Sequence, residues 1–160
     1  MDFTISRTFD VTADTMFRTW TECERLTQWW GPKGATVRVC KIDPQPGGTF
    51  LYCLRMPNGQ ELWGRFLYRE VVRPDRLVFV NSFSDEQGNI TRHPWNESWP
   101  LQLLSIITFA QDGGKTTVHV KWTPLNPTEA EKKTFNDGQA SMQQGWTGTM
   151  DQLGEYLSKT

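Results

Sequence analysis

The sequence predicts an α+β domain in which a curved antiparallel sheet of about six to seven strands wraps around one long C-terminal helix. Several short runs alternate between apolar and polar residues, as half-buried strands do. Turn signals rich in Gly, Pro, Asn and Asp separate these runs and leave short connections, which favours antiparallel pairing in meander order. From residue 128 onward the apolar residues recur every three or four positions, which is typical of an amphipathic helix.

The N-terminal part predicts one strand followed by two short helices. Residues 3–9 alternate as a strand does, and residues 12–20 carry their apolar side chains on one helical stripe. Residues 22–30 repeat the helical pattern until Gly31 and Pro32 end it.

Six further runs are expected to be strands, bounded approximately as 36–42, 49–56, 61–72, 76–83, 101–111 and 116–123. The alternation in these runs also indicates which side chains face the helix. Two of the inward positions, Asn81 and Ser105, are polar. Buried polar groups need partners, so these two side chains bind each other, a water molecule or a ligand.

The last third predicts a long helix. Thr128 and Glu131 match a capping box at its start. Between Phe135 and Leu157 the apolar residues follow one helical face, so the helical pattern covers about 30 residues, enough to span a domain. Several glycines in this segment weaken the helix and indicate a bend or a close approach to another part of the chain.

A wide curved sheet rarely closes perfectly on one helix, so we expect a ligand cavity between them. The expected wall consists of Phe50, Tyr52, Phe79, Phe83, Leu103, Trp122, Met142 and Trp146, with Asn81 and Ser105 orienting a polar end. Trp30 either borders this cavity or, together with Trp29, closes the corner between the short helices and the sheet.

Residues 84–100 form a long loop between two strands, and such loops often act as lids or binding loops. Trp95 and Trp99 either cover the cavity mouth or anchor the loop on the sheet edge. If the cavity is catalytic, it needs a proton donor or acceptor. The candidates for this role are His93 and Glu97 in the loop and Glu61 and Glu70 on a strand, with Arg55 or Arg65 as charge stabilisers.

Composition excludes several classes of protein. The 160 residues are one domain's length, spanning 1–160, and 17 Lys and Arg against 18 Asp and Glu give no basic field for nucleic acid or membrane lipid. Three cysteines without a C-x-x-C spacing make a disulfide framework or a zinc knuckle unexpected. Residues 1–7 hold no apolar run of signal-peptide type, so we expect a reduced, cytoplasmic chain. No metal or cofactor motif is present, and none is expected.

Five motifs occur in an order that is similar to one known family: Glu24-x-Leu26-x-x-Trp29-Trp30-Gly31-Pro32, Pro46-Gly47-Gly48, Pro74-x-Arg76-Leu77-Val78, Gly114-Lys115-Thr116-Thr117 and Gly145-Trp146 with Leu153. The chain resembles the Aha-type branch of the START/Bet v-like (SRPBCC) superfamily, named after an activator of the heat-shock chaperone ATPase. The resemblance covers Thr4 to Tyr156 and implies a helix-grip fold with a deep apolar cavity. Residues 84–100 are an insert relative to the short family pattern.

The resemblance leaves three functions open, because one fold hosts many activities. The first expectation is binding of a small apolar or amphipathic molecule in the cavity. The second is a cofactor-independent enzyme of the polyketide cyclase or dehydratase kind that uses the same cavity. The third is a stress-related module that contacts a chaperone, and a homodimer also stays open.

Overall fold

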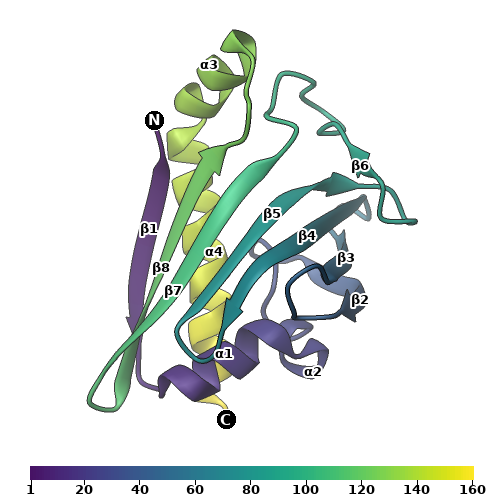
Figure 1. Cartoon of the computed structure of the whole chain (residues 1–160). Helices are drawn as coiled ribbons and strands as arrows, with labels where there is room; N and C mark the ends of the chain where they lie inside the picture. Colours follow the sequence, from purple (N-terminus) through teal and green to yellow (C-terminus); the bar gives the residue numbers. More distant parts are fainter.

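The computed structural model describes all residues 1–160 and forms one eight-stranded antiparallel sheet packed on a long helix (Figure 1). In chain order the elements are β1 (Phe3–Phe9), α1 (Ala13–Thr21), α2 (Cys23–Leu26), β2 (Thr36–Ile42), β3 (Thr49–Arg55), β4 (Glu61–Val72), β5 (Arg76–Ser84), β6 (Ile90–Thr91), β7 (Leu103–Asp112), β8 (Lys115–Pro124), α3 (Glu129–Asp137) and α4 (Gln139–Ser158). The helix-grip α+β fold predicted from the sequence is confirmed, including the two short helices after the first strand.

The strands follow the order β1-β8-β7-β5-β4-β3-β2, with β6 added beside β5. From β2 to β8 this is the predicted meander. The first strand joins the sheet beside the last one, with Phe3 opposite Trp122 and Phe9 opposite Thr116. Register shifts within β2 and at Tyr68 in β4 interrupt the ladders. Such bulges bend a strand and increase its twist, which helps the sheet curve around α4.

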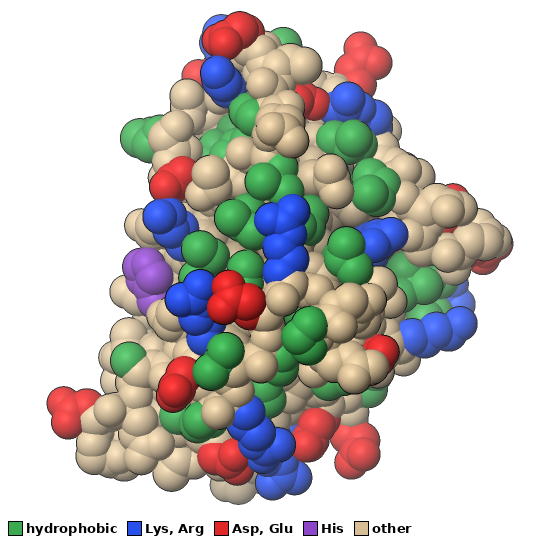
Figure 2. Space-filling model, in the orientation of Figure 1, with side chains coloured by type: hydrophobic (Ala, Val, Ile, Leu, Met, Phe, Trp, Pro, Cys, Tyr) green, Lys and Arg blue, Asp and Glu red, His purple; other side chains and the backbone are tan.

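The inner face of the sheet is covered by α4, which lies behind β8, β7 and β5 in Figure 1. Met150 and Leu153 of α4 are completely buried against the sheet. No helix covers the outer face, where Figure 2 shows small groups of hydrophobic side chains separated by charged ones. No helix is long and apolar enough to cross a membrane.

The C-terminal helical segment is divided, whereas the sequence predicted one face over about 30 residues. The break lies at Gly138, which ends α3 and precedes α4. A Cβ at this position would lie 3.2 Å from the carbonyl oxygen of Thr134 and 3.5 Å from the ring of Trp99. The contact with the Thr134 carbonyl oxygen is the tight one, and the Trp99 ring packs beside the break at ordinary contact distance. The predicted capping box at Thr128 and Glu131 is present.

The second short helix ends at Leu26, earlier than predicted, and continues as turns that carry Trp29 and Trp30. The indole of Trp29 donates to the carbonyl oxygen of Thr19 in α1 (3.1 Å) and fixes this corner.

Two of the three cysteines form a disulfide between Cys23 of α2 and Cys40 of β2. The expectation of a reduced chain without a disulfide is therefore wrong. Sequence spacing alone did not reveal the pair because it depends on the corner after α2 folding back onto the edge strand. Cys53 is the remaining free cysteine and is buried.

Candidate functional site

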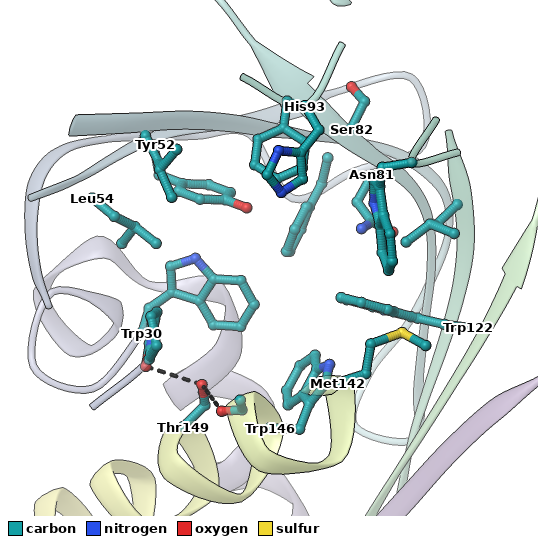
Figure 3. Close-up of a pocket in the computed structure, with 18 of the residues that line it drawn as sticks. Trp30, Tyr52, Leu54, Asn81, Ser82, His93, Trp122, Met142, Trp146 and Thr149 are labelled. Carbon is teal, nitrogen blue, oxygen red and sulfur yellow. Dashed lines mark hydrogen bonds between the residues drawn. The ribbon is translucent and has the colours of Figure 1, made fainter. Parts of the chain in front are cut away.

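A cavity of about 410 Å³ lies between the inner face of the sheet and α4 (Figure 3). Strands β3, β4, β5, β7 and β8 supply one wall, α4 supplies the opposite wall, and the insert 84–100 and the Trp30 corner complete it. Thirteen of its 22 lining residues are hydrophobic, and no Asp, Glu, Lys or Arg is among them. The cavity therefore offers rings and a few neutral polar groups to a ligand.

Trp146 of α4 is at the centre of an aromatic cluster on the helix side of the cavity. Its ring lies 5.6 Å from Trp122 and 5.9 Å from Trp30, both roughly edge to face, and 6.2 Å from Trp20 in a stacked arrangement. Such geometries are the favoured ones for aromatic pairs. The cluster makes this wall rigid, because each ring is held by others from different elements.

Trp30 is held in place by α4. Gln152 donates from Nε2 to the carbonyl oxygens of Gly31 (2.8 Å) and Trp29 (3.2 Å) on either side of it. Thr149 donates to the Gly31 carbonyl oxygen (3.0 Å), so its hydroxyl is engaged within the protein (Figure 3). The indole N–H of Trp30 itself is buried and has no hydrogen-bond partner.

Tyr52 supplies a phenol to the sheet side of the cavity. Burial raises the pKa of this phenol well above its usual value, so the group is neutral at physiological pH. Its ring lies 5.7 Å from Trp30, and Figure 3 shows the indole nitrogen of Trp30 on the side facing Tyr52.

Asn81 is the one amide of β5 that lines the cavity, and a neighbour fixes its orientation. The completely buried Ser105 of β7 donates to Oδ1 of Asn81. The two side chains thus bind each other, which is one of the alternatives predicted from the sequence, and this bond satisfies part of their hydrogen-bonding capacity. The Nδ2 group of Asn81 makes no hydrogen bond within the protein and remains available to the cavity.

His93 of the insert lines the cavity at the rim, 4.6 Å from the ring of Phe83. Its Nδ1 accepts a hydrogen bond from the backbone N–H of Trp95 (3.0 Å), so the neutral ring carries its hydrogen on Nε2. Burial lowers the pKa of His93, which favours this neutral form near pH 7.

Three contacts hold the insert against the rest of the molecule. Arg65 of β4 donates to the carbonyl oxygen of Gly88 (2.9 Å), and Arg92 pairs with the buried carboxylate of Glu131 in α3. The Trp99 ring packs 5.7 Å from Phe135. Trp99 thus both lines the cavity and anchors the loop, so the two alternatives considered for it are not exclusive.

The structure brings most of the predicted wall together: the cavity is lined by Trp30, Tyr52, Phe79, Asn81, Phe83, Trp99, Leu103, Trp122, Met142 and Trp146, as well as by His93. Phe50 and Ser105 are fully buried behind the lining. Trp95 is 57% exposed, outside the lining. Glu97 lies on the surface.

The other candidates for acid–base or charge roles pair elsewhere. Glu61 binds Arg38 and Arg55 near the sheet edge, and Glu70 binds Arg76. No three His, Cys, Asp or Glu side chains gather in a group that could hold a metal ion.

Sequence reasoning missed the contribution of β4. Leu62 and Phe66 line the cavity, and Phe66 stacks on Phe79 at 3.8 Å. The signal was present in the sequence, because Leu62, Gly64 and Phe66 alternate on one face of the strand. Thr149 and Ser141 of α4 also border the cavity and were not predicted.

Solved structures share this fold over nearly the whole chain. Protein Ms6760 from Mycobacterium smegmatis matches 99% of this chain and 91% of its own with a TM-score of 0.79 at 23% identity. For protein NE0264 from Nitrosomonas europaea, the match covers 99% of this chain and 95% of that protein, with a TM-score of 0.76 at 22% identity. For the AHSA1 protein from Silicibacter pomeroyi, the match covers 99% of this chain and 98% of that protein, with a TM-score of 0.76 at 18% identity.

The sheet wrapped around α4 thus defines a protein of the helix-grip class. The model of the family described as "Activator of Hsp90 ATPase homolog 1-like protein" matches residues 10–158, and the chain belongs to this family. No curated protein matches the chain at a significant level.

Proposed function

We propose that this protein binds a small apolar or amphipathic molecule in the cavity between the sheet and α4. The observation that carries this proposal is the cavity of about 410 Å³ with 13 hydrophobic lining residues. Small-molecule sites are typically clefts of about 300–1,000 Å³ with mostly apolar walls and a few convergent polar groups.

The apolar walls would supply the affinity, and the polar groups would orient the ligand. Each CH₂ group moved from water into the cavity contributes about 0.8 kcal/mol. Met142, with its flexible thioether, can adjust to ligands of different shape. Asn81, Tyr52 and His93 would fix the polar end.

The test is displacement of a hydrophobic dye such as ANS, together with native mass spectrometry of protein purified from cells. Leu103→Trp would fill the cavity, because Leu103 of β7 lines it. Leu104→Trp is the matched control, since the next residue of the strand points to the opposite face. We expect dye affinity to fall more than about tenfold in the first variant only. Equal dye binding by both folded variants would contradict the proposal.

A cofactor-independent enzyme is the second candidate, supported by the imidazole of His93 at the cavity rim. A neutral imidazole with Nδ1 anchored could exchange a proton at Nε2 with a bound molecule. The test incubates the protein with a metabolite extract and follows changed masses. His93→Gln should abolish any conversion, whereas Glu97→Gln on the surface should retain it. Conversion that persists in His93→Gln would exclude this role for His93.

A further inference from the structure

Two polar side chains that line the cavity, Asn81 and Tyr52, are each placed so that the group they offer to a ligand is a hydrogen-bond donor. The carbonyl oxygen of the Asn81 amide already accepts from Ser105. The NH₂ group is therefore what Asn81 offers to the cavity. Without Ser105, the Asn81 amide could turn either its oxygen or its NH₂ group toward the cavity.

Tyr52, on β3 of the same sheet, repeats this pattern with the help of Trp30. The buried N–H of Trp30 makes no hydrogen bond with a backbone group of the protein. It faces the phenol oxygen of Tyr52, so that oxygen is the nearest group to receive its hydrogen and the phenol O–H is left to donate (Figure 3).

The cavity lacks the charge that an anionic acceptor requires. No Lys or Arg lines it, and His93 is held neutral by its burial. A carboxylate or phosphate would lose its hydration without gaining a counter-charge, which is strongly unfavourable. A neutral carbonyl oxygen loses much less hydration free energy on entering the cavity, and it can accept hydrogen bonds from the same donors.

The walls determine the shape of the molecule. Flat rings border the cavity, with Trp146 and Trp122 facing it across from Tyr52 (Figure 3). Aromatic walls favour offset-stacked and edge-to-face contacts with another ring.

We propose that the cavity selects a neutral, planar, ring-containing molecule whose carbonyl oxygen accepts hydrogen bonds from Asn81 Nδ2 and the Tyr52 hydroxyl. This proposal rests on the binding function proposed above and specifies the chemical class of its ligand. The oxygen would lie on the sheet side of the cavity, and the rings would lie against Trp146.

Three probes with one ring system test this selection: fluorenone, which carries a carbonyl, fluorene, which lacks it, and fluorene-9-carboxylate, which is an anion. Equilibrium dialysis gives the affinity of each. We expect fluorenone to bind at least tenfold more tightly than fluorene, although fluorene is the more hydrophobic compound, and the carboxylate to bind most weakly.

Two variants locate the donors. Tyr52→Phe removes only a hydroxyl, and Asn81→Leu removes the amide, with Asn58→Leu in the exposed β3–β4 turn as the matched control. We expect the preference for fluorenone over fluorene to fall below threefold in Asn81→Leu and to fall severalfold in Tyr52→Phe. The control should keep the full preference.

The outcomes separate the two proposals. If fluorene and fluorenone bind equally well, or if the carboxylate binds best, the selection for a neutral carbonyl is overturned while the binding function stands. If none of the probes binds the folded protein and no dye is displaced, the binding function itself is overturned.

Discussion

The ring of Tyr52 lies directly over Gly64, its partner on the neighbouring strand. A Cβ at position 64 would lie 2.4 Å from both Cζ and Oη of Tyr52. Only a glycine allows the ring to lie this close to the sheet. The space that Tyr52 leaves free is part of the cavity, so one missing methyl group determines its depth.

Gly64→Ala should therefore reduce ligand binding more than stability. The clash involves the far end of a side chain, and the ring can rotate into the cavity. We expect probe affinity to fall more than about tenfold and unfolding free energy to fall by about 1–3 kcal/mol, measured by dialysis and urea unfolding. Gly114→Ala, with open space around its Cβ, is the control. In a Tyr52→Ala background, Gly64→Ala should lower the unfolding free energy only slightly. A decrease as large as in the wild type would contradict this explanation.

The disulfide between Cys23 and Cys40 should stabilise the corner that carries Trp30. It closes a loop with a sequence separation of 17 residues. The double variant Cys23→Ser/Cys40→Ser is expected to lose about 3 kcal/mol of unfolding free energy in denaturant titration. Alkylation of the unfolded, unreduced protein should label one cysteine, Cys53. Labelling of all three cysteines would show that the disulfide does not form.

The ion pair between Arg92 and Glu131 should hold the insert against α3. The hydrogen bond from the Thr128 backbone and the pairing with Arg92 lower the pKa of Glu131. Because Arg92 is about half exposed, we expect Arg92→Ala to cost about 1–2 kcal/mol in thermal or urea unfolding. Lys132→Ala, which breaks an exposed pair with Glu129 in the same helix, should change stability by less than about 0.5 kcal/mol.

The same carboxylate predicts a pH dependence. A lowered pKa means that the contribution of Glu131 is complete above its unfolded value of 4.5 and is lost as the pH falls through the folded value. Stability measured from pH 6 to pH 3 should therefore fall less in Glu131→Gln than in the wild type. Parallel pH profiles for the two proteins would argue against this contribution.

His93 should make ligand affinity depend on pH. Burial lowers the pKa of His93 from 6.5, so its packed position in the insert favours the neutral ring, and this preference is lost as the pH falls below 6.5 through the folded value. The affinity for a neutral probe should decrease severalfold between pH 7.5 and pH 5. His93→Gln should give a flat profile, and His119→Gln, on the exposed face of β8, should keep the wild-type profile. A flat profile in the wild type would exclude this coupling.

The sequence by itself determined the seven long strands, their inward faces and the helical segment that covers them, but not the short strand β6 or the break between α3 and α4. These features depend on alternation and periodicity over a few neighbouring residues, as in β3, where Tyr52 and Leu54 share the cavity side. Ten of the predicted ring, amide and apolar positions reached the lining for that reason.

Only the tertiary structure decided the contacts between distant segments. The pairing of Cys23 with Cys40, the ion pair of Arg92 with Glu131 and the break at Gly138 beside Trp99 each join segments that no local pattern connects. The cavity depth also depends on how the Tyr52 ring rests on Gly64 of another strand. Such contacts form only when the curved sheet closes on α4, because the distances between these side chains are set by the curvature and register of the whole sheet.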